Sequence, residues 1–321
     1  MNIPIKSIDT TEDFYRMSYF SDISALRNSL QEVGQVQPLW LEVLEDERFR
    51  VISGFRRLEA ALGLGWQDIE AETISGTPEQ RFDWFRKTLF ENLSLRSFNW
   101  VEKAFVLRKL KNQFHVPEEE ILKNWLPTLQ IGQNRKWLHW LSAIPNYETE
   151  VQEAIATDSL TFDLFEFLSA LDGKSRVALV RFFQTLNLGK NRQKEFFALL
   201  RDVALRERIS MATLLDKKEI KTILQTESSS LGQKTQRLRE LFRGWRYPHL
   251  FQTEKRFHQI VRDLRLPPVI QLKPPQNFEG DKFRLEFMFR TGKDFAAVVT
   301  KLQDVVASGK MNELDRLWEE N

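Results

Sequence analysis

The chain has 321 residues, 42% of them hydrophobic, and it contains no cysteine. This length predicts two or three domains, and the lack of cysteine excludes disulfides, thiolate catalysis and cysteine-ligated metal centres. Four scattered histidines lack metal-ligand spacing, no stretch suits a membrane span, and the N-terminus lacks the basic and apolar regions of a secretory signal, so we expect a soluble, cytoplasmic protein.

Positive charge is unevenly placed along the chain, although the formal net charge is only +2. Residues 1–100 carry 11 Lys/Arg and 16 Asp/Glu, whereas residues 217–265 carry 12 Lys/Arg and 5 Asp/Glu. Such a basic segment is typical either of a solvated helix face or of a polyanion-binding surface, and composition does not separate the two.

The first hundred residues alternate between strand and helix patterns. A helix is predicted from Asp22 to Val33, because apolar residues recur at helical spacing before Gly34. Strands are predicted at 39–43, 49–52 and 68–73, and helices at 55–62 and from 78 into Glu91-Asn92. This alternation predicts a small mixed α/β domain over 1–98.

From Asn99 onward, apolar residues keep a helical period that is interrupted at Pro and Gly. Helices are predicted at 99–112, 118–125, 133–142, 148–156, 161–171, 175–187, 190–207 and 217–225. The polar, Ser-rich stretch 226–233 predicts a linker. The tail predicts a helix at 251–264, strands at 269–272 and 283–289, the second with one buried face, and a helix at 293–306.

These patterns predict an α+β multidomain chain. Its parts are the mixed α/β domain over 1–98, a mainly helical domain over 99–225, a basic linker over 226–249 and a small α+β domain over 250–321.

The segment with the clearest chemical meaning is the junction from Val51 to Arg57, in which Gly54 separates a strand from a helix. A glycine at such a junction lets the backbone approach a ligand, and the helix N-terminus offers free N–H groups and the positive end of the dipole. Arg56 and Arg57 add charge-assisted donors, a combination that suits phosphate. A surface helix start with two solvated arginines is the alternative interpretation.

The pair Glu91-Asn92 closes the predicted helix that begins near residue 78. A carboxylate beside an amide carbonyl can supply two hard oxygen ligands to Mg²⁺, which usually also binds phosphate oxygens. An ordinary helix C-terminus with Asn as its cap is the alternative.

Four ordered boxes in the first 110 residues resemble the ParB family. They are Arg16, Gly34-Gln35-Val36-Gln37-Pro38-Leu39, Ser53 to Ala61, and Glu91-Asn92-Leu93 with Asn99 and Glu102-Lys103-Ala104. In the family, the second box reads G-[IL]-x-x-P-[IL], the third reads G-E-R-R-x-x-A, and the fourth reads E-N-x-x-R followed by N-x-x-E-x-A. In that family these boxes form a pocket for CTP and Mg²⁺. The resemblance implies a ParB/sulfiredoxin-like fold that binds nucleotide at Arg16, Gly34, Gln35, Gly54, Arg56 and Arg57 and Mg²⁺ at Glu91 and Asn92.

The chain departs from the family pattern at two positions. Phe55 replaces the acidic residue after the glycine, and Leu95 occupies the arginine position of the last box, with Arg96 one residue later. Both changes put nucleotide hydrolysis in doubt, so at most a weak CTPase is expected and no catalytic residue is assigned. Sulfiredoxin activity is excluded, because Phe55 stands where that chemistry needs a cysteine.

The resemblance also implies a helix-turn-helix after the last box. A first helix is predicted to begin at Glu118, and the stretch from Asn124 to Leu129 predicts a longer turn than usual. The candidate recognition helix begins with Gln133, Asn134, Arg135 and Lys136, side chains that suit base edges or phosphates. A helical bundle that makes no groove contact is the alternative.

A second group of basic residues lies at helical spacing and suits DNA phosphates. It comprises Lys234, Arg237, Arg239, Arg243 and Arg246. The tail resembles more loosely the family's C-terminal dimerisation domain over Glu279 to Phe287 and Phe295 to Leu302, and its apolar strand suits a partner edge. A self-contained α+β domain is the alternative.

We therefore expect a nucleoid-associated homodimer that binds CTP, Mg²⁺ and double-stranded DNA and acts as a two-state switch. Two other functions stay open. One is a nucleotide-dependent small-molecule phosphotransferase with Glu32 or Glu59 as its base, and the other is a non-catalytic interaction protein with a degenerate pocket.

Overall fold

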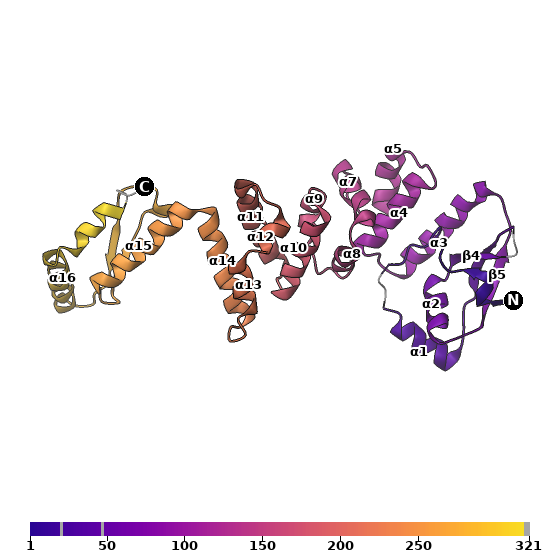
Figure 1. The fold of residues 1–321 in the computed structure, drawn as a ribbon, viewed down its shortest axis with the longest axis horizontal. Helices are drawn as coiled ribbons and strands as arrows, with labels where there is room; N and C mark the ends of the chain where they lie inside the picture. Colours follow the sequence, from indigo (N-terminus) through magenta and orange to yellow (C-terminus); the bar gives the residue numbers. More distant parts are fainter. Residues whose placement is uncertain (20–21, 46–47, 318–321) are drawn as a thin grey trace. The chain divides into compact units, whose positions relative to one another are not determined.

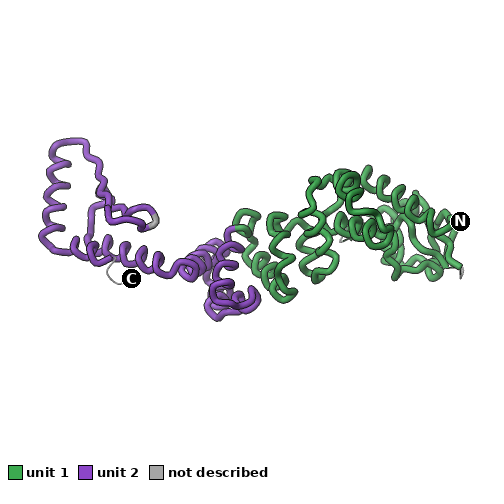
Figure 2. The backbone as a smooth tube through the Cα atoms, turned by 90° about the horizontal axis from the view of Figure 1, so that it is seen from above, with its two compact units in different colours: residues 1–194 green, residues 195–321 purple. Residues whose placement is uncertain are grey.

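The computed structural model describes residues 1–19, 22–45 and 48–317. They form two compact units, Met1–Lys194 and Glu195–Asn321 (Figure 2). The first unit holds a sheet and helices, and the second holds helices and a β-hairpin, which confirms the expected α+β class. No helix in the described part of the chain combines the length and the apolar character needed to cross a membrane.

A five-stranded sheet with the order β1-β5-β3-β4-β2 forms the centre of the N-terminal region. Its strands are β1 (Asn2–Pro4), β2 (Ile8–Asp9), β3 (Leu39–Val43), β4 (Phe49–Ser53) and β5 (Asp68–Ile74). The central strands β3 and β4 are antiparallel, whereas β5 runs parallel to β3 and β2 runs parallel to β4. The predicted strands at 39–43, 49–52 and 68–73 are therefore confirmed within one residue.

Two adjacent helices, α1 (Ser24–Val33) and α2 (Phe55–Gly63), accompany this sheet (Figure 1). Leu58 and Ala61 of α2 join Leu39, Leu41 and Val51 of the strands in one buried cluster, so apolar burial holds α2 against the sheet. Helix α3 (Arg81–Leu95) follows β5 and continues three residues past Asn92. The pair Glu91-Asn92 thus lies inside the last turn of α3 rather than at its end.

Helices make up the rest of the first unit. They are α4 (Trp100–Asn112), α5 (Glu118–Glu120), α6 (Leu126–Thr128), α7 (Arg135–Ala143), α8 (Thr149–Ala156), α9 (Phe165–Leu168) and α10 (Gly173–Thr185), and α11 (Lys190–Glu207) continues into the second unit. Helix α4 begins with a capping box in which Asn99 and Glu102 satisfy each other's backbone N–H groups, and it packs against α7 and α8.

The expected long turn from Asn124 to Leu129 is not present. A π-helical segment, Ile121–Trp125, joins α5 to α6, so helical structure continues from Glu118 to Thr128. Pro127 lacks an N–H donor, and the wider π turn before it lets the helix accommodate this residue. The connection to α7 therefore lies further along the chain, at residues 129–134, where Gln130 adopts a left-handed conformation with φ of 56°.

The second unit contains α12 (Met211–Leu215), α13 (Lys218–Gln225), α14 (Leu231–Arg246), α15 (Pro248–Leu264) and α16 (Gly292–Ala307). Strands β6 (Ile270–Lys273) and β7 (Arg284–Phe287) form an antiparallel hairpin. The stretch 226–249, expected as a basic linker, consists mostly of α14, which begins with a Ser230–Gln233 capping box and buries Thr235, Leu238 and Phe242. Burial of this apolar stripe explains why the stretch is a packed helix.

The C-terminal hairpin has one half-buried and one open side. Phe283 packs face to face on Phe257 of α15 with a ring distance of 5.8 Å, and Leu272 joins the same cluster. No residue of β7 is fully buried, and Met288 and Phe289 just beyond it are 88% and 54% exposed. The expected buried face of 283–289 is therefore only partly covered within this chain.

Candidate functional site

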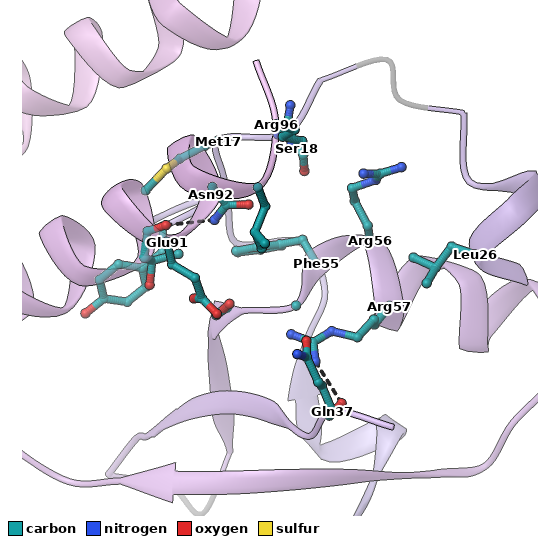
Figure 3. A pocket seen from close by; sticks show the side chains of 15 residues that line it. Met17, Ser18, Leu26, Gln37, Phe55, Arg56, Arg57, Glu91, Asn92 and Arg96 are labelled. Atoms are coloured by element: carbon teal, nitrogen blue, oxygen red, sulfur yellow. Dashed lines mark hydrogen bonds between the residues drawn. The ribbon is translucent and has the colours of Figure 1, made fainter. Parts of the chain in front are cut away.

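The turn between β4 and α2 admits only glycine. Gly54 has φ of +103°, and a Cβ at this position would overlap Cδ2 of the fully buried Leu39 and lie 3.2 Å from Nη2 of Arg57. Its carbonyl accepts the first helical bond from the Leu58 amide at 3.0 Å. The turn thus places the N-terminus of α2, with its free N–H groups, at the pocket that Phe55, Arg56 and Arg57 line (Figure 3).

The two arginines of α2 make different contacts. Arg57 donates from Nη1 to the carbonyls of Gln37 at 2.7 Å and Pro38 at 2.9 Å. Burial lowers the pKa of Arg57, and the nearby charge of Glu91 opposes this shift. Arg56 donates from Nη2 to the Asp22 carbonyl at 2.9 Å, while its buried Nε has no hydrogen-bond partner among the residues that the structure describes. Both guanidinium groups therefore keep donors that a ligand can engage.

Glu91 and Asn92 line the same pocket from α3. The Asn92 side chain donates from Nδ2 to the Thr88 carbonyl at 2.8 Å, which orients its amide and leaves the carbonyl oxygen free to act as a ligand (Figure 3). Within the described ranges, Glu91 takes part in no ion pair, and no cluster of three or more Asp, Glu or His side chains is able to hold a metal. A cation here would therefore rely on ligand oxygens in addition to these two residues.

The pocket has a volume of about 290 Å³ and is bordered by segments far apart in sequence. Its lining residues are Tyr15, Met17, Ser18, Leu26, Gln37, Ser53, Gly54, Phe55, Arg56, Arg57, Thr88, Glu91, Asn92, Leu95 and Arg96. The structure thus brings together Gly54, Arg56, Arg57, Glu91 and Asn92, which sequence reasoning had selected from two separate boxes.

Some buried polar side-chain atoms at the pocket have unused hydrogen-bonding capacity. Four buried side-chain polar atoms lack a hydrogen-bond partner among the described residues, and three of them, Ser18 Oγ, Arg56 Nε and Thr88 Oγ1, belong to residues that line this pocket. Buried polar groups in native proteins are nearly always paired, and an unpaired one costs roughly 1–3 kcal/mol. Their concentration here indicates a site built for a polar ligand.

Arg16, Gly34 and Gln35 do not line the pocket. Arg16 pairs with Glu59 at 3.1 Å and lies over the ring of Phe55 at 5.9 Å, near the pocket wall. Gln35 fastens its loop to β5, donating from Nε2 to the Glu70 carbonyl at 2.7 Å and accepting from the Glu70 amide at 2.8 Å. Gly34 ends α1 with φ of 73° and open space around its α-carbon.

Sequence reasoning did not select Ser18, Gln37 or Thr88. Ser18 reaches the pocket through tertiary contacts that no local pattern reveals, whereas Gln37 lies in the second sequence box, from which only Gly34 and Gln35 were selected. Thr88 did leave a signal, because it is a polar residue on the buried face of α3 between Phe85 and Leu89, one turn before Glu91 and Asn92. The departures Phe55 and Leu95 both line the pocket, and Arg96 binds the buried Glu102 at 2.7 Å.

One wall of the pocket is a segment without regular structure, residues 13–19, which we call the strap. Helix α4 holds its backbone: Lys109 donates to the Asp13 carbonyl, Gln113 to the Phe14 carbonyl at 3.0 Å, and Asn99 to the Tyr19 carbonyl at 3.2 Å. Burial lowers the pKa of Lys109 to about 8. The strap therefore touches the pocket through its side chains and α4 through its carbonyls.

A buried carboxylate ties the strap to the sheet as well. Glu42 on β3 is 2% exposed and accepts from the Tyr15 hydroxyl at 3.2 Å, from Arg50 at 3.1 Å and from Arg81 at 2.7 Å. Arg50 also lies over the ring of Phe14 at 4.9 Å. Two cations and a hydroxyl thus compensate the buried charge, and the strap is held on both sides.

The expected recognition residues lie at the exposed start of α7. Asn134 is the N-cap and accepts from the Lys136 amide at 2.9 Å, and Gln133 donates to the Lys123 carbonyl at 3.0 Å. Arg135 forms an ion pair with Glu119 of α5. An exposed pair of this kind contributes little to stability, so Arg135 can exchange its partner at low cost.

The basic residues of α14 are mostly paired with acids of the same unit. Arg239 binds Glu195 through two bonds of 2.6 and 2.8 Å, Arg243 binds Glu254 at 3.3 Å, and Arg246 binds Asp202 at 2.5 Å. Lys234 donates to the Leu224 carbonyl at 2.6 Å and Arg237 to the Ser229 hydroxyl at 3.1 Å. The charge excess counted along the sequence is therefore smaller at this surface than its composition implies.

Beside the C-terminal hairpin is an apolar surface that we call the hairpin surface. It combines Val269, Met288, Phe289 and Phe295, which are between 42% and 88% exposed. A concavity formed by Pro267, Val269, Met288, Phe289, Arg290, Asp294, Ala297 and Val298 lies in the same region. Exposed apolar groups of this size beside an open strand edge are typical of an interaction surface.

Comparison with known proteins identifies the first region. Residues 1–82 match the family model of the ParB N-terminal domain. Over 163 residues the chain is 25% identical to the chromosome-partitioning protein ParB of Myxococcus xanthus (50% of this chain, 51% of that protein). It is 24% identical to a nucleoid occlusion protein of Bacillus cereus (50% and 52%). The chain thus spans about half the length of these relatives.

Two solved structures of Caulobacter crescentus ParB, both truncated at the C-terminus, are also similar. The one complexed with CTP-gamma-S has 21% identity and a TM-score of 0.26, covering 56% of this chain and 96% of that chain. The one complexed to the centromeric parS site has 17% identity and a TM-score of 0.33, covering 61% and 97%. Residues 1–82 of the chain are therefore similar to the ParB N-terminal domain, and the resemblance to the ParB family that the sequence boxes indicate is confirmed.

Proposed function

We propose that the chain is a ParB-like switch that binds CTP with Mg²⁺, binds double-stranded DNA and acts as a homodimer. The observation that carries this proposal is the pocket at the N-terminus of α2, which is lined by Arg56, Arg57, Ser18 and Thr88. Three buried polar atoms of these residues, Arg56 Nε among them, have no hydrogen-bond partner in the described part of the chain. A nucleoside triphosphate satisfies all of these groups at once, because it brings several phosphate oxygens to a helix N-terminus.

In this proposal each pocket residue has a defined role. The backbone N–H groups that follow Gly54, together with Arg56 and Arg57, bind the phosphates. Glu91 and Asn92 hold Mg²⁺, which would neutralise phosphate charge when bound. Glu32 and Glu59, considered as bases for a phosphotransferase, do not line the pocket. We therefore favour a binding switch over a phosphotransferase.

The strap supplies a physical route from the pocket to the helical region. A ligand that contacts Ser18 also acts on a segment whose carbonyls are held by Lys109, Gln113 and Asn99. Those residues belong to α4 or cap it, and α4 packs against α7, which carries the recognition residues. Nucleotide occupancy would thus bias the position of α4. A two-state switch requires an element whose position the ligand biases in this way, and α4 would be that element.

For DNA, we propose contacts at the start of α7 and along α14. Gln133, Asn134, Arg135 and Lys136 are all exposed, as base or phosphate contacts require. On α14, phosphates would replace the carboxylate partners of Arg239, Arg243 and Arg246, and would add contacts with Lys234 and Arg237. This exchange requires breaking ion pairs, so we expect weaker binding at α14 than its charge count implies.

For assembly, we propose that a second copy of the chain covers the hairpin surface. Helix α15 covers only part of the hairpin, and pairing with a second copy would cover its open side. The exposed Met288 and Phe289 would then be buried at the interface.

A titration with two variants tests the nucleotide proposal. The double variant Arg56→Ala/Arg57→Ala should weaken CTP binding by roughly 10- to 150-fold per lost charge-assisted bond, measured by isothermal calorimetry with Mg²⁺ present. Arg86→Ala is the matched control, because Arg86 also lies on a helix of this domain but outside the pocket. Unchanged affinity in the double variant would show that the site is wrongly assigned.

A further inference from the structure

Thr88 differs from six other threonines in the helices of this protein. A helical threonine commonly donates its hydroxyl to the carbonyl four residues earlier. Thr128, Thr185, Thr222, Thr235, Thr253 and Thr300 all do so, at distances of 2.7 to 3.0 Å. Thr88 is 4% exposed, and its hydroxyl has no partner among the described residues.

The position of Thr88 explains what its hydroxyl can reach. Residues three and four apart lie on one face of a helix, so Thr88 shares a face of α3 with Glu91 and Asn92. All three line the pocket, and the Asn92 amide donates to the Thr88 carbonyl at 2.8 Å. Thr88 therefore lies one helical turn from the two residues that we assign to Mg²⁺ and borders the same pocket.

Apolar packing does not account for a threonine at this position. Its neighbours on the buried side of α3 are Trp84, Phe85 and Leu89, and valine has the same shape as threonine without a hydroxyl to satisfy. A buried hydroxyl is tolerated here if a ligand completes its hydrogen bond. Ser18 and Arg56 line the same pocket and also have an unpaired buried atom, so Thr88 is one of three pocket-lining residues of this kind among the described residues.

We propose that Thr88 contacts the bound nucleotide and that its hydroxyl forms a hydrogen bond with the triphosphate–metal end of that nucleotide. This inference rests on the nucleotide site proposed above. It assigns to α3 a third contact beside Glu91 and Asn92. Because the contact is made to phosphate or to its metal-bound water, it should strengthen the binding of different nucleoside triphosphates by a similar factor.

The test is the isosteric variant Thr88→Val in the full chain, with Thr88→Ser to restore the hydroxyl and Thr235→Val as the matched control. Thr235 has the same 4% exposure, but its hydroxyl is paired with the Leu231 carbonyl. Calorimetry with CTP and Mg²⁺ should give roughly tenfold weaker binding for Thr88→Val, and near-native binding for Thr88→Ser and Thr235→Val. Thermal unfolding without nucleotide should be unchanged or shifted upward for Thr88→Val and shifted downward for Thr235→Val.

Each outcome decides the question. Native affinity in Thr88→Val, while the wild type binds CTP, would overturn the role of Thr88 alone. A fall in the unfolding temperature of Thr88→Val that matches Thr235→Val would assign the hydroxyl to the fold instead of the ligand. If the wild type binds no nucleoside triphosphate, the proposed function fails, and the role of Thr88 fails with it.

Discussion

Replacing Gly54 by alanine should damage both the fold of the N-terminal domain and its pocket. At φ of +103° an L-residue is strained, and its Cβ would overlap the buried side chain of Leu39. The strain costs about 1–2 kcal/mol, and forcing a methyl group into a packed core costs about 1–3 kcal/mol more. We therefore expect Gly54→Ala to destabilise this domain by roughly 2–5 kcal/mol.

Gly65, just beyond the other end of α2, provides a matched control. It also has a positive φ, of +76°, but a Cβ there would meet nothing within 4 Å. Gly65→Ala should therefore cost only the backbone strain, about 1–2 kcal/mol. The difference between the two variants isolates the overlap with Leu39 and the displacement of Arg57.

Native-state hydrogen exchange measures this difference in stability at the strand that leads into Gly54. The amides of Val51 and Ile52, in the core of β4, should exchange faster in Gly54→Ala than in Gly65→Ala by roughly 5- to 150-fold, which corresponds to 1–3 kcal/mol. Gly54→Ala should also lose CTP binding, because the methyl group displaces Arg57, whereas Gly65→Ala should keep it. Equal exchange in the two variants would refute the packing argument at Gly54.

Three further predictions concern the strap, the assembly and DNA. The pKa of Lys109 is lowered to about 8 in the folded chain, against 10.5 for the free group, so between these pH values only the unfolded chain keeps this proton. The free energy of unfolding should therefore rise across this pH range, by on the order of 3 kcal/mol. Denaturant titrations of Lys109→Met should lack this rise, and a pH profile equal to that of the wild type would refute the assignment. Phe289→Asp should turn a dimer into a monomer by light scattering at micromolar concentration, because it places a charge in the hairpin surface; a wild-type monomer would contradict the proposed assembly. Asn134→Ala/Arg135→Ala should reduce discrimination between a preferred and a random duplex, and equal discrimination by variant and wild type would exclude base contacts at α7.

Local patterns predicted the elements that build the phosphate-binding side of the pocket. The strand–Gly–helix junction at Gly54 depends on neighbouring residues, so its strand and helix were predicted within one residue. The opposite wall depends on chain segments that meet only after folding. Ser18 reaches the pocket because α4 holds the strap, and no spacing rule reveals this contact.

In and around α14, composition alone was a poor guide to the structure and to the surface charge. The Ser-rich stretch before α14 predicted a linker, yet Ser230 and Gln233 form a capping box that starts a helix. Net charge likewise overstated the basic surface of α14, because Glu195 and Asp202 come from α11, far away in sequence, to pair with Arg239 and Arg246. Counting charges along a chain cannot reveal such pairing.

Calorimetry of the full chain with CTP, ATP, GTP and UTP, each with and without Mg²⁺, measures whether the pocket lined by α2 and α3 binds a nucleoside triphosphate. We expect saturable binding of CTP that strengthens with Mg²⁺, because Glu91 and Asn92 would supply oxygen ligands beside the phosphates. Absence of binding by all four nucleotides in the presence of Mg²⁺ would contradict this expectation.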